Sequence, residues 1–338
     1  MKNRIDSFIG NFFIILGIFC LLLWWYQKYM LGSSRQNTQV SQSWTLSTIE
    51  KIDENLLNPT ETFSIWLVEL NVENLEKETI FYHDVVGFDT ISKSWNIVNL
   101  WENGKTFLRL FEEENYTRAP RTEAWLYHIA ITHNNRKDLA LRVKNILEKA
   151  PERYQWSADH SATEAFYFSD PEGNGLELYY DKPRKDWVWK DRKPTMGTTA
   201  LDTASYIKKY SDVPVSEWTT KMGHVHLKVG NIAEAQKFYQ DILLFEVMNN
   251  RGDALFVSRD KYHHHIGMNT WESLGAGKRT KNSYGLRSFE LQYFNKYTYE
   301  QVRSNLRRNT IPVEYRDGSI EVSDPWGNII IITLTNSL

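Results

Sequence analysis

An internal repeat limits the folds open to this chain more than any other feature of its sequence. The segment VELNVENLEKETIFYHDVVGF at 68–88 matches VHLKVGNIAEAQKFYQDILLF at 225–245, and the matching positions are offset by 157. A second match joins DPEGNGLEL at 170–178 to DPWGNIIII at 324–332. Self-similarity of this kind indicates that supersecondary units are repeated along the chain.

Each copy of the repeat predicts the same order of elements. The first match reads as an alternating strand followed by a helix that carries Phe-Tyr on its buried face. The second reads as an Asp-Pro turn with Gly and Asn that leads into an apolar strand. We therefore predict an α+β fold of four units, each a strand, a helix and then further strands, at about 62–115, 124–180, 220–272 and 285–336.

The first residues differ from the rest of the chain. Residues 7–27 carry no charge and are long enough to span a bilayer core. We predict a single transmembrane anchor within 1–30, followed by a polar linker over 31–60. Basic residues flank the apolar stretch on both sides, so the charges do not fix its orientation. The alternative is that translation begins at Met30.

The remaining chain is predicted to form two sequence modules. The first covers 61–180 and the second 220–338, and a connector rich in Trp and Lys, predicted to serve packing, joins them over 181–219. The net charge of −2 gives no basic field for nucleic acid. The single cysteine, Cys20, excludes a disulfide or a thiolate metal site within the chain. The oligomeric state stays open.

Four such units, with the motifs GHVHLKV, YHHHIGMNTW, LYHIAI and DPEGNGLELY, resemble the vicinal oxygen chelate superfamily. Within it, the chain is most similar to the catechol 2,3-dioxygenase proteins. The resemblance implies that βαβββ units pair into two half-open barrels. It also implies that metal ligands come from the first and last strands of a unit.

The ligand positions implied by the resemblance are filled only in units two and three. They hold His128 and Glu177 in unit two, and His224 and one of the three consecutive histidines in unit three. His226, on the same strand face as His224, is the alternative to it. We prefer His224 because it aligns with His128. The equivalent positions in units one and four hold residues such as Leu67 and Ile331. We therefore predict that units two and three form the functional barrel, and that units one and four form a metal-free one.

Two histidines and one carboxylate form a facial set that suits Fe(II) and leaves positions open for substrate and O₂. Mn(II) would fit the same ligands, and zinc would also accept them. By the resemblance, these three residues bind Fe(II), and His264 and Tyr167 are catalytic. His264 transfers protons, and Tyr167, ten residues before Glu177, donates a hydrogen bond to the substrate.

The run of three histidines is predicted to lie on a strand. Alternation would then turn His263 and His265 to one face and His264 to the other. Three other histidines, His83, His133 and His160, are predicted to have surface or loop roles. For His160, which lies just before the Tyr167 strand, the alternative is that it lines the pocket.

The resemblance implies an Fe(II)-dependent extradiol dioxygenase that acts on a catechol-type aromatic diol with O₂. The alternatives are a glyoxalase-like isomerase or thiol transferase of the same fold, or a membrane-tethered protein that binds an aromatic compound. The predicted location is the membrane, through the N-terminal helix. The cytoplasmic side is favoured for the catalytic part, because Fe(II) survives better in a reducing compartment.

Overall fold

The computed structural model describes residues 54–102, 104–212 and 220–335. The predicted anchor lies outside these ranges, as does most of the predicted linker. Within them, no helix has both the length and the apolar character needed to cross a membrane. The described end of the linker forms the short helix α2, Glu54–Leu57. Its Leu56 is buried and accepts a hydrogen bond from Arg184, so this part of the linker packs on the folded body.

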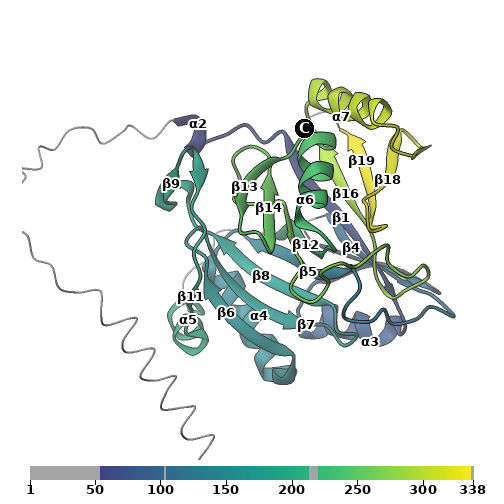
Figure 1. The fold of residues 1–338 in the computed structure, drawn as a ribbon. Helices are drawn as coiled ribbons and strands as arrows, with labels where there is room; N and C mark the ends of the chain where they lie inside the picture. The colour runs from purple at the N-terminus through teal and green to yellow at the C-terminus, as the bar shows by residue number, and fades with distance from the viewer. Residues whose placement is uncertain (1–53, 103, 213–219, 336–338) are drawn as a thin grey trace, which may run out of the picture. The chain divides into compact units, whose positions relative to one another are not determined.

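The predicted order of elements is present in all four units (Figure 1). Unit one contains β1 (Phe63–Val72), α3 (Leu75–Ile80), the π-helix η1 (Phe81–Val85), β2 (Asp89–Ser94), β3 (Ile97–Glu102) and β4 (Lys105–Glu112). Unit two contains β5 (Leu126–His133), α4 (Arg136–Lys149), η2 (Pro151–Arg153), β6 (Tyr154–Asp159), β7 (Thr163–Ser169) and β8 (Gly175–Asp181). Each unit is thus a strand, a helical crossover and three strands.

The second half repeats this order after the connector. The connector contains η3 (Arg184–Asp186), β9 (Trp189–Lys190), β10 (Lys193–Pro194), β11 (Thr199–Ala200) and α5 (Thr203–Tyr210). Unit three contains β12 (Thr220–Lys228), α6 (Ile232–Gln236), the π-helix η4 (Lys237–Ile242), β13 (Glu246–Asn250), β14 (Ala254–Ser258) and β15 (Ile266–Asn269). Unit four contains β16 (Gly285–Tyr293), α7 (Lys296–Arg308), β17 (Val313–Arg316), β18 (Ser319–Ser323) and β19 (Ile329–Leu334).

All four crossover helices begin in the same way. An asparagine precedes each helix, and its side-chain oxygen accepts a hydrogen bond from the backbone N–H three residues later. Such a cap satisfies one of the N–H groups that a helix leaves without a partner at its start. These four residues are Asn74, Asn135, Asn231 and Asn295. The shared cap supports the interpretation that the four units are copies of one motif.

The two sheets each combine one unit from each half of the chain. One sheet has the order β17-β18-β19-β16-β1-β4-β3-β2, which joins units one and four. The other has the order β11-β6-β7-β8-β5-β12-β15-β14-β13, which joins units two and three. The strand order confirms the predicted pairing across the midpoint of the chain. The first strands of units two and three, β5 and β12, are antiparallel neighbours at the centre of their sheet.

The two repeated motifs meet in space. In the first half, Tyr82 of η1 donates a hydrogen bond to Asp170 of the Asp-Pro turn (3.1 Å). In the second half, Tyr239 of η4 donates to Asp324 in the same way (3.0 Å). Each bond joins two units that lie in different sheets. The Phe-Tyr helices and the Asp-Pro turns therefore hold the two sheets together, and this contact explains why both motifs recur.

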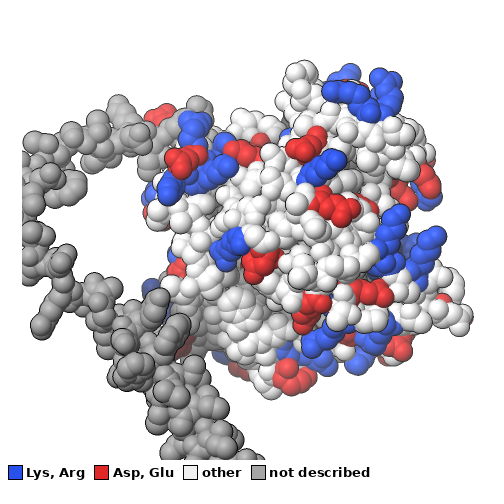
Figure 2. Space-filling model, in the orientation of Figure 1, with Lys and Arg blue, Asp and Glu red and all other residues white. Residues whose placement is uncertain are grey.

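The surface seen in Figure 2 mixes lysine and arginine with aspartate and glutamate, and white patches separate them. No field of a single sign dominates this face. The view agrees with the small net charge of the sequence.

Candidate metal and substrate site

The central strand β5 sets the positions of the candidate ligands. Its Ala130 is in register with Glu177 of β8 on one side and with His224 of β12 on the other. His128 lies two residues earlier on β5, and therefore points to the same face of the sheet. All three ligand-type side chains are buried, and the small Ala130 lies between them in the sheet.

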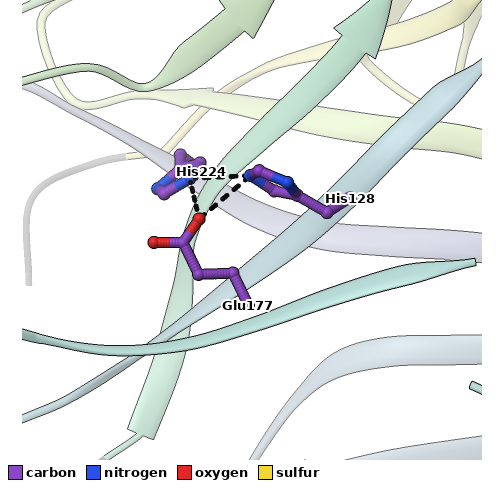
Figure 3. A group of neighbouring side chains, drawn as sticks. All are labelled: His128, Glu177 and His224. Atoms are coloured by element: carbon purple, nitrogen blue, oxygen red, sulfur yellow. Dashed lines mark hydrogen bonds and ion pairs between the residues drawn. The ribbon is translucent and has the colours of Figure 1, made fainter. Parts of the chain in front are cut away.

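The three side chains converge on one point (Figure 3). Oε2 of Glu177 lies 3.0 Å from Nε2 of His128 and 3.2 Å from Nε2 of His224. The two Nε2 atoms are 3.3 Å apart. Within the described ranges, this is the one group of three or more histidine, cysteine or acidic residues with ligand atoms close enough to share a metal ion.

These separations fit a metal ion. Metal–ligand bonds of about 2.1–2.3 Å at right angles place neighbouring ligand atoms about 3.0–3.3 Å apart. Two imidazoles and one carboxylate on one face of a metal are the donor set of non-haem Fe(II) oxygenases. Manganese accepts the same atoms, so the donor set alone does not choose between the two metals.

The protonation states also suit metal binding. Burial raises the pKa of the Glu177 carboxyl, but His224 and His128 outweigh burial and leave that pKa well below its usual range. Burial lowers the pKa of His224 to about 4, against the opposing effect of Glu177. A metal ion requires an ionised carboxylate and neutral imidazoles. The shifts of Glu177 and His224 both favour the forms that bind a metal.

The structure separates His224 from the alternative, His226. Nε2 of His226 lies 3.0 Å from Nδ2 of Asn269 and is not part of the converging group. Gly267 lies against the His226 ring, where a β-carbon would be in close contact with it. His226 lines the cavity beside the three ligands, while His224 faces Glu177.

A cavity of about 110 Å³ opens beside the three residues. Its wall includes Tyr167, whose ring stacks on Trp156 at 4.3 Å with an angle of 6° between the planes. The Tyr167 hydroxyl lies 2.9 Å from Nε2 of His160, and Nδ1 of His160 lies 3.0 Å from the Gly197 carbonyl. A carbonyl only accepts, so neutral His160 donates to it and accepts from Tyr167. The Tyr167 proton is therefore directed to His160, and its oxygen lone pairs remain for a ligand.

The predicted strand over the three histidines is wrong. Strand β15 begins at Ile266, and the histidines lie in the loop before it. Asp260 and Lys261 have positive φ angles of 53°, which make a tight turn after β14. All three histidines are nevertheless buried. His264 packs on His224, with ring centres 4.1 Å apart, while His263 and His265 both contact the ring of Tyr262.

Of the three other histidines, one differs from the prediction. His133 is neither in a loop nor at the surface, because it lies at the end of β5, is buried, and its Nδ1 is 3.3 Å from the Tyr179 carbonyl. His160 lies in a loop, as predicted, and lines the cavity, as in the alternative. His83 lies in η1 at the surface, with an exposed side chain.

The connector also contributes to the site. Its Trp187 and Trp189 stack on each other, with ring centres 5.5 Å apart, which agrees with the predicted packing role. However, β11 joins the edge of the sheet that carries the site, and Met196 and Thr198 line the cavity. No periodicity in the connector could have shown this.

Two features of the site were not predicted: the contribution of Asp181 and the contact between His160 and Tyr167. Asp181 lies on β8 at the second alternate position after Glu177, so both point to the same face. That alternation was the one signal available for Asp181. His160 precedes the Tyr167 strand, but only the turn between β6 and β7 brings its ring against the tyrosine hydroxyl.

Comparison with known proteins finds two dioxygenases that are similar in sequence to this chain. No family model matches the chain. The catechol-2,3-dioxygenase of Bacillus subtilis is 33% identical over 273 residues, which cover 78% of this chain and 95% of that protein. The manganese-dependent 2,3-dihydroxybiphenyl 1,2-dioxygenase of Geobacillus genomosp. 3 is 25% identical over 167 residues, 47% of this chain and 49% of that protein.

A solved structure shares the fold. The crystal structure of a candidate dioxygenase from Bacillus subtilis superimposes with a TM-score of 0.55 at 13% identity, and covers 81% of this chain and 86% of that one. At that identity the match supports the architecture alone. Together with the long match to the Bacillus subtilis enzyme, it shows that the chain belongs to the catechol-2,3-dioxygenase family of dioxygenase enzymes, within the vicinal oxygen chelate superfamily.

Proposed function

We propose that the protein is a metal-dependent extradiol dioxygenase that opens the ring of a catechol-type aromatic diol with O₂. One observation carries the proposal. His128, Glu177 and His224 converge beside a cavity, and the buried imidazole of His264 lines the same cavity. The names of the relatives, a catechol and a dihydroxybiphenyl dioxygenase, support the substrate class.

His128, Glu177 and His224 would hold the metal, Fe(II) in our proposal, with Mn(II) as the alternative. The bound ion would supply open coordination positions for the diol and O₂ and would exchange electrons with them. The chain contributes a carboxylate whose pKa is held low and two imidazoles, and all three side chains are buried. Burial of these groups strengthens their electrostatic interaction with a bound charge.

The remaining cavity residues have separate roles in this proposal. The stacked Trp156 and Tyr167 offer a flat apolar wall to an aromatic ring. His264, which faces the cavity beside His224, accepts a proton from a substrate hydroxyl and later returns a proton to the product side. The resemblance implies that Tyr167 donates to the substrate, but in this proposal its proton goes to His160 and its oxygen accepts a hydrogen bond from the diol.

The stoichiometry of O₂ use tests the proposal. Ring opening beside the diol breaks one carbon–carbon bond and places both atoms of O₂ in one product. Catechol and O₂ should therefore disappear in equal amounts when protein loaded with Fe(II) or Mn(II) receives a catechol. Labelled O₂ should transfer both atoms to the product.

Two other results would contradict the proposal and identify an alternative. Turnover of a thiol adduct of an α-oxoaldehyde without O₂ uptake would indicate a glyoxalase-like isomerase. Tight binding of catechols with neither metal nor turnover would indicate a binding protein.

A further inference from the structure

A chain of hydrogen bonds runs from Asp181 through two of the three consecutive histidines to the cavity. Oδ1 of Asp181 lies 2.9 Å from Nε2 of His263. Nδ1 of His263 lies 2.8 Å from Nδ1 of His264. Both imidazoles are buried, whereas the Asp181 side chain keeps 29% of its surface exposed. These hydrogen bonds therefore connect the partly exposed carboxylate of Asp181 to the imidazole of His264, which lies against the candidate ligand His224.

If His263 is neutral, the acceptor character of Asp181 fixes the direction of both hydrogen bonds. A carboxylate only accepts, so Nε2 of His263 carries a hydrogen and donates it. Neutral His263 then has a lone pair on Nδ1, and Nδ1 of His264 must be the donor between the two rings. Neutral His264 consequently has no hydrogen on Nε2. Its Nε2 makes no hydrogen bond to the described residues, and His264 lines the cavity.

The surroundings hold both rings in place. The His263 ring lies against Tyr262, with centres 3.9 Å apart, and against Trp187 at 5.7 Å. The His264 ring lies between His224 at 4.1 Å and Phe256 at 5.1 Å. The second oxygen of Asp181 accepts a hydrogen bond from Tyr262 (2.7 Å), which fixes the carboxylate as well. The hydrogen bonds from Asp181 through His263 to His264 are therefore preorganised by the surrounding side chains.

We propose that Asp181 and His263 are positioning residues that hold His264 as the Nδ1–H tautomer, with the Nε2 lone pair directed into the cavity. The inference rests on the proposed function, in which His264 receives a proton from the substrate. In that step the substrate O–H bond breaks and an Nε2–H bond forms on His264. The positive charge then lies one imidazole away from the Asp181 carboxylate, which stabilises it.

The direct test determines which ring nitrogen carries the hydrogen. Nitrogen NMR of labelled, metal-free protein distinguishes protonated from unprotonated imidazole nitrogens, and it does not depend on activity. The wild-type protein should show His264 protonated at Nδ1 and bare at Nε2. Asp181→Asn keeps the shape but can donate from its amide, so this variant should shift His264 towards the Nε2–H tautomer. A wild-type His264 protonated at Nε2 would overturn the proposal.

Kinetics of the metal-loaded enzyme provide the second test. Asp181→Asn and His263→Asn should lower kcat by about 10- to 100-fold, as loss of such supporting partners typically does, while KM and metal content stay near those of the wild type. The matched control is His265→Asn. Nδ1 of His265 accepts from the Arg259 backbone N–H, and an asparagine oxygen can take that place, so kcat should be retained.

Two results would show that Asp181 and His263 support the fold and do not position His264 for catalysis. One is an equal loss of kcat in His263→Asn and His265→Asn that follows a loss of thermal stability. The other is an unchanged kcat and tautomer in Asp181→Asn. If the wild-type enzyme used no O₂ with any catechol, the proposed function would fail, and the NMR result would still decide the tautomer.

Discussion

Glu78 lies at a position where the two halves of the repeat carry different kinds of residue. It is fully buried on α3, next to the carboxylates of Asp170 and Glu172. By the offset of the repeat, its counterpart in the second half is Ala235, and the counterpart of Glu172 is Trp326. Burial, followed by the repulsion from Asp170 and Glu172, raises the pKa of Glu78 from 4.5 to about 10. The folded chain therefore holds this carboxyl in its neutral form.

This raised pKa predicts how stability depends on pH. Between pH 4.5 and about 10 the folded state binds a proton at Glu78 that the unfolded state releases, so stability falls as pH rises through this window. The slope from one such proton is at most about 1.4 kcal/mol per pH unit. Glu78→Gln is neutral at every pH and should remove this slope, which denaturant unfolding at about pH 6 and about pH 8.5 would measure.

The control for this prediction is Glu76→Gln, on the exposed side of the same helix. It should leave the pH dependence as in the wild-type protein. Equal pH slopes in the wild type and Glu78→Gln would show that Glu78 is ionised in the folded state.

For single residues, the sequence predicted some members of the site and missed others. His128, Glu177 and His224 were predicted from their places in the repeated units, and the structure brings them together. The link between Asp181 and His263 joins positions 82 apart in the sequence, and no local pattern reports such a contact. The prediction of a strand over the three histidines is wrong because the alternation of residues does not show at which residue a strand begins or ends. The turn at Asp260 and Lys261 delays β15 to Ile266.

At the scale of elements, the Phe-Tyr helices and the Asp-Pro turns form one device that occurs twice. Asp170 and Asp324 accept the same four bonds, from two backbone N–H groups, an asparagine side chain and a tyrosine. The pattern predicted that each motif exists, but not that they touch. Their contact depends on the crossing between two sheets, which the sequence of either element does not contain.

The tyrosine–aspartate contact predicts that removing the tyrosine hydroxyl lowers stability by a similar amount in each half of the chain. Tyr82→Phe and Tyr239→Phe each remove one buried donor and leave an aspartate oxygen without it. A hydrogen bond to a charged group is worth about 1.5–3 kcal/mol. The free energy of unfolding of each variant, measured by denaturant unfolding, should therefore be lower by about that amount. Tyr297→Phe, at an exposed tyrosine of α7, is the control and should be neutral. Neutral Tyr82→Phe and Tyr239→Phe variants would mean that the helices only pack by their rings.

At the scale of the whole molecule, the units of each sequence half lie in different sheets. The repeat predicted four units, and the lopsided filling of the ligand positions predicted how they pair. The strand order agrees with both. The boundaries of the two sequence modules stay predictions, as do the N-terminal anchor and the side of the membrane. The edge strand and cavity wall supplied by the connector had no sequence signal.

This interleaving predicts that neither half holds a complete site. A chain of residues 61–180 carries His128 and Glu177 but lacks His224, and its β5 has no β12 to pair with. Neither this chain nor one of residues 220–338 should bind Fe(II) or Mn(II) as the full protein does, while the two mixed together should recover metal binding. Titration calorimetry would measure this. Wild-type metal affinity in either half alone would contradict the pairing.

Metal content per chain decides whether His128, Glu177 and His224 form a metal centre. Protein purified without oxygen should contain a single iron or manganese ion per chain. Glu177→Ala should lose that ion, because two neutral imidazoles alone hold a divalent metal weakly, and an alanine at the neighbouring His226 should leave it in place. An ion retained in full by Glu177→Ala, or a wild-type protein that binds neither iron nor manganese, would contradict the assignment of His128, Glu177 and His224 as the metal centre.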